Sequence, residues 1–253
     1  MHKIEQENSG IIALELKNIS KHFEKFVAVN NLTLQVPKNI IFTLLGPNGA
    51  GKTTTINMIC GLSEISEGSI HFPAYQGKDF KRLIGYCPQE NVIYPKLTCL
   101  EQLEFVGCMH DIDSKSAKRR ALELLEKMGL SEKKDTLASK LSGGMKRRLT
   151  ICLALIHDPE ILILDEPEAG LDPQSRILVR EFILNFKNSK TIILTTHNMD
   201  EAERLSDIVA IMDSGKILTQ GTPSFLKSNS LNQEYKTLED VFISLTGRSL
   251  RDN

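Results

Sequence analysis

The sequence has no apolar stretch long enough to cross a membrane. A spanning helix needs about 18–20 apolar residues, whereas the longest apolar runs, such as residues 40–45 and 161–164, have the length of a buried strand. The first ten residues, MHKIEQENSG, also lack the apolar run of a signal peptide. We therefore expect any role at a membrane to depend on a partner that spans it.

Neither sign of charge is in excess. The 31 basic and 32 acidic residues give a formal net charge of −1, whereas a nucleic-acid-binding domain usually carries a strongly basic face or tail. We therefore expect no nucleic-acid partner. The five cysteines form no CxxC pair, which favours reduced thiols in a cytosolic protein over a disulfide framework.

Short apolar runs alternate with helical stretches along the chain. Residues 12–16 and 32–36 alternate apolar and polar side chains, as half-buried antiparallel strands do. Residues 40–45, 160–164 and 191–194 are nearly unbroken apolar runs, which are typical of strands covered on both faces. Helical spacing is found in residues 52–60, 100–108, 115–128, 143–157, 175–186 and 237–245.

This order predicts an α/β fold with a mostly parallel core sheet, an N-terminal antiparallel β edge and an inserted helical lobe. No internal repeat or low-complexity segment divides the chain, so we expect a single domain over residues 1–253. Residues 1–96 and 158–253 are expected to form the core with its antiparallel edge, and residues 97–157 a helical subdomain.

A phosphate-binding loop is indicated by residues 46–53, GPNGAGKT, which match the pattern GxxxxGK[ST]. Its glycines let successive backbone N–H groups converge on phosphate oxygens, and the following helix directs its positive end to the same place. Lys52 supplies a positive charge for the β and γ phosphates, and the Thr53 hydroxyl suits Mg²⁺. The candidate nucleotide-binding residues here are Gly46, Pro47, Asn48, Gly49, Ala50, Gly51, Lys52, Thr53 and Thr54. The motif follows an apolar strand and opens a helix, which separates it from a chance turn.

Two carboxylates, Asp165 and Glu166, follow the apolar run at residues 161–164. Where a strand of an α/β sheet ends, the chain turns and neighbouring side chains can reach one site. Asp165 suits the Mg²⁺ shell, and Glu166 is placed to orient or deprotonate an attacking water. An acidic pair before Pro167 can also merely begin a loop, but the phosphate-binding loop favours the catalytic interpretation.

A second glycine-rich turn, LSGGM at residues 141–145, precedes a helix and places Ser142 at an N-cap. Such a turn is an anion site in principle, but many like it bind nothing. The order of six motifs is more specific: the phosphate-binding loop, Gln89, LSGG, LDE at 164–166, GLD at 170–172 and TH at 196–197. With these motifs, residues 14–245 resemble the nucleotide-binding subunits of ATP-binding-cassette (ABC) transporters.

The resemblance implies a P-loop NTPase core and gives the other candidate residues their roles. It implies that Gln89 senses Mg²⁺ and the membrane partner, that Asp172 communicates across a dimer, and that His197 contacts the γ-phosphate. It implies that Ser142, Gly143, Gly144 and Met145, the signature, close over the ATP held by a second subunit. It also implies that Phe23 stacks on adenine.

A structural interpretation competes for two of these residues. An aromatic residue near a strand end, such as Phe23, is more often part of a core than a base-stacking platform, and Phe26 lies close by. A histidine is usually a satisfied core residue, but His197 ends an apolar strand, where α/β proteins build their sites.

The sequence also departs from the family pattern. Met145 stands where the family most often has glutamine, residues 69–83 look shorter than the usual antiparallel segment, and Glu168 replaces a small or hydroxylated residue. We expect Glu168 near the dimer seam, where its charge would weaken closure. The tail at residues 238–242 and 245–248 and the run at 145–148 resemble the exporter-type, ABC-2-like subgroup.

Together these features predict an ATPase that couples hydrolysis of Mg²⁺-bound ATP to substrate movement by a separate integral-membrane permease. The expected catalytic residues are Glu166, His197, Lys52 and Gln89, and the expected Mg²⁺ ligands are Thr53, Gln89 and Asp165. We expect a second ATP-binding subunit, most simply an identical chain, at the cytoplasmic face of the membrane. Two alternatives are a soluble ABC-type ATPase in assembly and a nucleotide-sensing module without turnover; Glu166 and His197 speak against the second.

Overall fold

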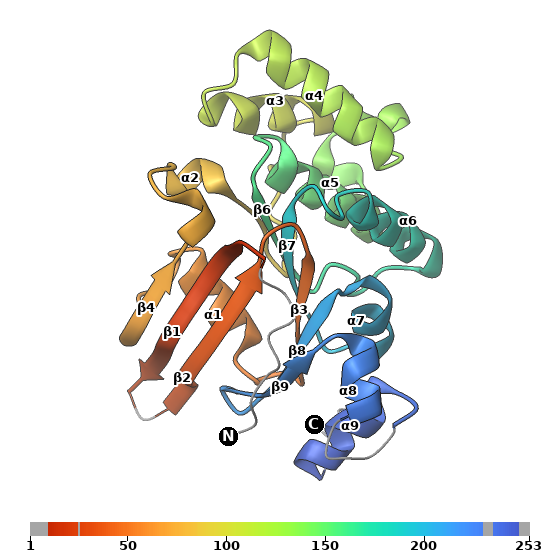
Figure 1. The fold of residues 1–253 in the computed structure, drawn as a ribbon. Helices are drawn as coiled ribbons and strands as arrows, with labels where there is room; N and C mark the ends of the chain where they lie inside the picture. Colours follow the sequence, from red (N-terminus) through yellow and green to blue (C-terminus); the bar gives the residue numbers. More distant parts are fainter. Residues whose placement is uncertain (1–9, 25, 230–234, 248–253) are drawn as a thin grey trace.

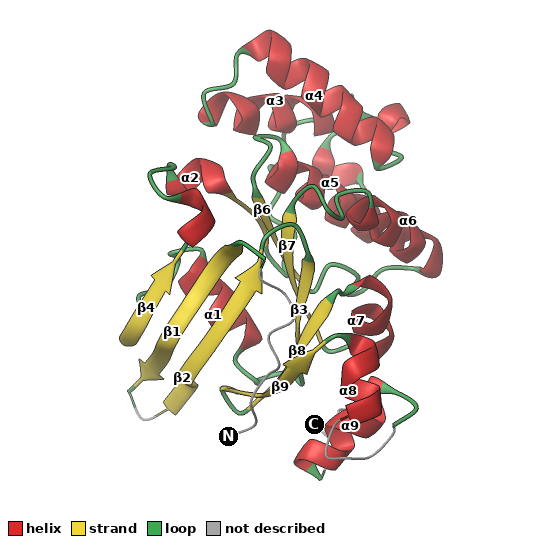
Figure 2. Cartoon of the chain, viewed as in Figure 1, coloured by secondary structure: helices red, strands yellow, loops and turns green. Residues whose placement is uncertain are grey.

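The computed structural model describes residues 10–24, 26–229 and 235–247, which form two sheets and a set of surrounding helices (Figures 1 and 2). The expected subgroup residue Arg248 lies outside the described residues. No helix in these three ranges is long and apolar enough to span a bilayer.

An antiparallel sheet is built from the N-terminal strands. It contains β1 (Ile12–Phe23), β2 (Phe26–Pro37) and β4 (Glu67–His71) in the order β2-β1-β4. The predicted N-terminal antiparallel strands are thus confirmed and form a sheet of their own. Both long strands extend further than the alternating runs, with several irregularities in their pairing. The short segment at residues 69–83 still supplies the end of β4 and the brief helix α2 (Phe80–Leu83).

The core sheet has the order β5-β6-β7-β3-β8-β9. Its strands are parallel except for the last, which pairs antiparallel with β8. The elements are β3 (Ile41–Leu45), β5 (Ile84–Cys87), β6 (Ile161–Asp165), β7 (Thr191–Thr196), β8 (Ile208–Asp213) and β9 (Lys216–Gly221).

Three central strands are buried at every residue, as their unbroken apolar runs predict. On β6, Leu162 and Leu164 pack in the cluster that contains the helical subdomain, whereas Ile161 and Ile163 pack in the cluster under the antiparallel sheet. Successive side chains point to opposite faces, so a strand covered on both faces needs an apolar residue at each position.

The predicted helices are all present. They are α1 (Lys52–Ile59), α3 (Cys99–Met109), α4 (Ser114–Lys127), α5 (Gly143–Leu155), α6 (Pro173–Leu184) and α9 (Leu238–Thr246), joined by α7 (Met199–Leu205) and α8 (Pro223–Asn229). Helices α3 and α4 lie at the end of the molecule opposite the C-terminal helices (Figure 1). Helix α5 packs between them and strands β5 and β6, and its residues 147–155 are all buried.

The junction between β7 and α7 contains a buried carboxylic acid. Glu201 is 2% exposed and its Oε2 accepts a hydrogen bond from Thr196 Oγ1 at 2.5 Å. Its other oxygen has no hydrogen-bond partner within the described ranges. Burial, with a smaller contribution from the nearby Glu168 carboxylate, raises the pKa of Glu201 from about 4.5 to about 8.

This carboxylic acid should make stability depend on pH. The folded state keeps a proton that the unfolded chain releases above pH 4.5, so stability falls as pH rises towards 8. Glu201→Gln removes the ionisation and keeps the shape, so the variant should melt about 3–8 °C above the wild-type protein at pH 8. The difference in melting temperature between the variant and the wild-type protein, measured by thermal unfolding, should become smaller towards pH 5.

The control is Glu123→Gln, which removes an exposed carboxylate from α4. Its melting temperature should differ little from that of the wild-type protein at either pH. An offset for Glu201→Gln that is equal at pH 5 and pH 8 would show that Glu201 is ionised in the folded protein throughout.

Candidate active site

The phosphate-binding loop joins β3 to α1 and is held close to its neighbours. A Cβ atom at Gly46 would lie 2.1 Å from the backbone oxygen of Met212, and one at Gly51 would lie 2.5 Å from that of Ala28. Gly51 also has a φ of 101°, which favours glycine. The motif therefore needs these two glycines for its backbone path, while Asn48 and Gly49 at its tip are exposed.

Lys52 points back into this loop. Its side chain is 6% exposed, and its Nζ donates hydrogen bonds to the carbonyl oxygens of Gly46 at 2.7 Å and Pro47 at 3.0 Å. Burial lowers the pKa of Lys52, while the carboxylates of Glu166 and Asp165 oppose the shift. A phosphate in the loop offers charged oxygens in place of the two carbonyls, and these accept stronger hydrogen bonds.

Asp165 lies at the end of β6, beside the first turn of α1. Its Oδ2 accepts a hydrogen bond from Thr53 Oγ1 at 2.9 Å, and its Oδ1 accepts a short one from Thr195 Oγ1. A hydroxyl and a carboxylate at this separation fit the oxygen ligands that Mg²⁺ prefers. No cluster of three His, Cys, Asp or Glu side chains suited to a metal occurs in the described part of the chain.

Glu166 reaches the same place because the backbone turns. Its φ is +53°, outside the range of a strand, and its N–H donates to Thr195 O and to Thr195 Oγ1, each at 3.1 Å. The side chain is buried between Lys52 and His197: Oε1 lies 3.7 Å from Lys52 Nζ, and Oε2 lies 2.7 Å from Nδ1 of His197. His197 is 51% exposed, so the core interpretation of this histidine is wrong.

The signature lies next to the start of α6 in its own chain. Ser142 caps α5 by accepting from the N–H of Met145 at 3.3 Å, and Asp172 caps α6 by accepting from the N–H of Ser175 at 3.0 Å. A Cβ atom at Gly144 would lie 2.8 Å from Ser175 Oγ, whereas one at Gly143 would meet nothing within 4 Å. Gly143 therefore faces open space.

The structure thus assembles five predicted residues into one connected cluster: Lys52, Thr53, Asp165, Glu166 and His197. No hydrogen bond or ion pair found among the described residues joins that cluster to the side chains of the other candidates, which are Phe23, Gln89, Ser142 and Asp172. The side chain of Gln89 is exposed, and the backbone carbonyl oxygen of this residue accepts a hydrogen bond from Arg147 at 3.1 Å.

Phe23 lies at the end of β1, opposite Phe26 of β2. The residue is 49% exposed, and Lys21 Nζ lies over its ring, 5.0 Å from the ring centroid. The core interpretation of Phe23 is therefore wrong.

Three residues important to the site were missed in the sequence. The Thr195 hydroxyl donates to Asp165 and accepts from the N–H of Glu166, but in the sequence this residue stands in a Thr-Thr pair that matches no motif. Arg147 is 3% exposed, but it stands in a basic run, KRR at residues 146–148, that gives no sign of burial. Helical spacing could have found it, because it lies one turn after Gly144 on a helix that is apolar from there onward except at Arg148 and Thr150.

The third is Arg180, which compensates the unusual Glu168. Arg180 donates from Nε at 2.9 Å and from Nη2 at 2.7 Å to the two oxygens of that buried carboxylate. Such a bidentate pair neutralises the charge within the chain. The expectation that Glu168 weakens dimer closure thus loses its electrostatic basis.

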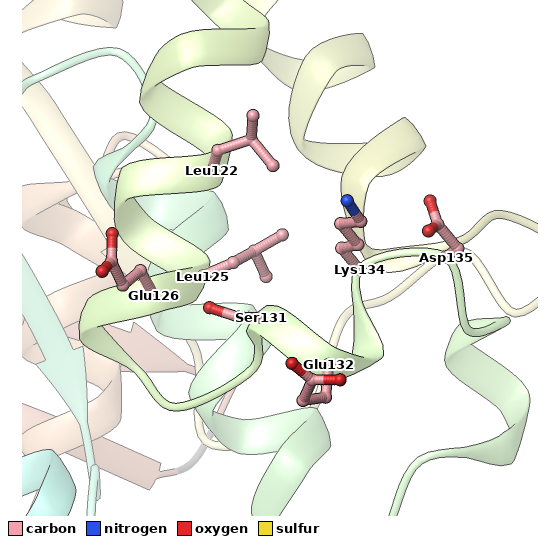
Figure 3. Close-up of a pocket in the computed structure, with 7 residues that line it drawn as sticks. All are labelled: Leu122, Leu125, Glu126, Ser131, Glu132, Lys134 and Asp135. Atoms are coloured by element: carbon pink, nitrogen blue, oxygen red, sulfur yellow. The ribbon is translucent and has the colours of Figure 1, made fainter.

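A surface hollow of about 460 Å³ lies away from these residues, between α4 and the turn that follows it (Figure 3). Leu122 and Leu125 line it on the helix, and Glu132, Lys134 and Asp135 line it on the turn. None of the candidate residues contributes to this hollow. This hollow is therefore not part of the candidate site.

Comparison with known proteins agrees with this geometry. The model of the family described as ABC transporter matches residues 29–169. The chain is 43% identical over 220 residues to the linearmycin resistance ATP-binding protein LnrL of Bacillus subtilis, a match that covers 85% of this chain and 71% of that protein. It is 37% identical over 249 residues to the Nod factor export ATP-binding protein I of Cupriavidus metallidurans, with 93% and 82% covered.

Longer relatives and a solved structure give the same result. The chain is 40% identical to ABC transporter A family member 6 of Dictyostelium discoideum but spans only 14% of its length. A solved structure described as the ATP binding subunit of an ABC transporter superposes with a TM-score of 0.82 at 29% identity, covering 92% of this chain and 99% of that one. The predicted fold is confirmed, and the chain belongs to the ABC transporter family as one of its ATP-binding ATPase domains.

Proposed function

We propose that this chain binds ATP with Mg²⁺ and that its hydrolysis drives substrate movement by a separate integral-membrane permease. The observation that carries the proposal is the connected cluster in which Glu166 lies between Lys52 and His197. The two bacterial relatives are named for resistance and export and as ATP-binding proteins, which supports an exporter-type, ABC-2-like role. The chain then lies at the cytoplasmic face of the membrane, attached through the permease.

The triphosphate lies in the loop at residues 46–54. Backbone N–H groups of the loop and the N-terminus of α1 face the phosphates, and Lys52 exchanges the carbonyls of Gly46 and Pro47 for phosphate oxygens. Thr53 and Asp165, with Gln89 as a further ligand, hold Mg²⁺. The metal, when bound, neutralises negative charge on the β and γ phosphates. Phe23 stacks on the adenine.

Glu166 orients the attacking water and accepts its proton. As the new bond from the water oxygen to the γ-phosphorus forms, the bond from that phosphorus to the β–γ bridging oxygen breaks, and ADP keeps the bridging electron pair. His197 donates to the γ-phosphate and holds the Glu166 carboxylate. The protein contributes chiefly position and charge, as is usual in phosphoryl transfer.

A second ATP-binding subunit, most simply an identical chain, completes each site. Gly143 faces open space and Ser142 is exposed, so the signature is available to the ATP of another chain. Asp172, beside Gly144 at the start of α6, then lies at the same seam. The movement that closes the two subunits is transmitted to the permease by the helical subdomain at residues 97–157 and by the segment that begins at Gln89.

Glu166→Gln should retain ATP binding and lose turnover. The amide keeps the shape of the side chain but accepts no proton, and loss of a general base typically reduces rates by about 10²–10⁴-fold. Phosphate release should fall by that factor, and gel filtration with ATP should show a trapped dimer. The matched control is Glu168→Gln, which removes a buried carboxylate two residues away that Arg180 holds apart from the cluster. A Glu166→Gln variant as active as the wild-type protein would refute the assignment of the base.

The signature should act on the ATP of the other chain. Gly143→Asp puts a carboxylate into open space, so the isolated variant should bind ATP normally through its own loop. Turnover should be lost, because the carboxylate repels the partner's γ-phosphate in a poorly hydrated seam. Gly143→Ala adds a methyl group without charge, so this variant should lose less turnover than Gly143→Asp.

The contrasting variant is Lys52→Ala, which damages the loop and leaves the signature intact. ATP affinity is measured at low protein concentration, where chains are monomeric. If Gly143→Asp weakens that affinity as much as Lys52→Ala does, the signature acts within its own chain and the shared site is wrong.

A further inference from the structure

Two adjacent arginines on α5 are buried. Arg147 is 3% exposed and Arg148 is 8% exposed. Burying a guanidinium is costly unless its N–H groups are bonded. The groups that accept hydrogen bonds from each arginine therefore show which segments of the chain it holds together.

Every N–H group of Arg147 has a main-chain acceptor. An arginine has five such donors, and here Nε serves one carbonyl oxygen while Nη1 and Nη2 serve two each. The acceptors are Pro167 at 3.3 Å from Nε, Pro88 (a short contact) and Gln89 at 3.1 Å from Nη1, and Asp165 at 2.5 Å and Glu166 at 3.1 Å from Nη2.

These carbonyls belong to two segments that follow neighbouring strands of the core sheet, where Cys87 of β5 pairs with Leu164 of β6. One segment follows β5 and carries Gln89; the other ends β6 and carries Asp165 and Glu166. Arg147 itself lies one turn after the signature glycines on α5. No carboxylate pairs with Arg147 among the described residues, so this cation is held by the backbone of the site alone.

We propose that Arg147 is a positioning residue that fixes the backbones of Gln89, Asp165 and Glu166 relative to the signature helix. A movement of α5 on ATP closure is then transmitted through one guanidinium to the Mg²⁺ ligands and to the base together. This inference rests on the proposed function, because it assigns Arg147 a role in the same reaction.

Arg148 offers a matched control on the same helix. Its Nη1 donates to the carbonyl oxygens of Met128 at 2.7 Å and Gly129 at 3.4 Å, which follow α4. It therefore ties α5 to the end of α4 within the helical subdomain, and the hydrogen bonds found for it in the described residues reach no residue of the site. Replacing it tests the general effect of losing a buried arginine from α5.

The experiment compares Arg147→Lys, Arg147→Gln and Arg148→Lys with the wild-type protein. Lysine keeps the charge but has three donors on a single atom, so it cannot bridge both segments. We expect kcat of both Arg147 variants to fall by about 10²-fold, the effect of a misplacement of about 1 Å. The Mg²⁺ concentration for half-maximal rate should rise several-fold, while ATP affinity measured in EDTA stays unchanged. Arg148→Lys should change melting temperature but neither kcat nor Mg²⁺ dependence.

Each other outcome has a defined meaning. A folded Arg147 variant with wild-type kcat and Mg²⁺ dependence overturns the inference, and so does an equal loss of kcat in Arg148→Lys. If neither Arg147 variant folds while Arg148→Lys does, the residue serves folding alone and the positioning role is overturned. If wild-type protein that binds ATP releases no phosphate, the proposed function fails instead.

Discussion

The parallel pairing of β6, β7 and β3 is the constraint on which the site depends. Asp165 lies beside Thr195, and Leu45 lies beside Thr196, so the three strands end level with one another. The loop after β3, the carboxylates after β6 and the histidine after β7 therefore leave the sheet at one edge. Thr195 fixes the register chemically as well, because its hydroxyl donates to Asp165 and accepts from the N–H of Glu166. A slip of one residue would turn the apolar side chains of β7 from one packed face to the other.

Three side chains of the site hold one another through a chain of contacts. Lys52 is buried, and it is compensated by two loop carbonyls and by the nearby Glu166. Glu166 is in turn held by Lys52 and His197. These contacts hold the three side chains close to one another at the end of the sheet.

The sequence predicted the parts of the fold that have strong local signals. The runs at residues 40–45 and 160–164 are apolar at almost every position because both faces of β3 and β6 are covered. Such a run predicts a strand that is buried on both faces. Strand β5 has only four residues, and β9 is partly exposed, so neither stands out. Among site residues, Lys52 and Asp165 follow from motif chemistry, whereas the role of Arg147 depends on carbonyls brought together from distant segments. Helical spacing can single out Arg147, but no local pattern shows which carbonyl oxygens it binds.

The contacts of Arg147 also bear on how the molecule folds. Its acceptors come from residues 88–89 and 165–167, on either side of the helical subdomain that carries it. A state in which the sheet has formed but α5 has not docked would leave those carbonyls unbonded, and a state in which α5 packs alone would bury a cation without acceptors. Both partly folded states are therefore raised in free energy. The insertion and the core should then open as one cooperative unit in native-state hydrogen exchange. An arginine that positions an active site thereby also prevents the helical insertion from behaving as an independent domain.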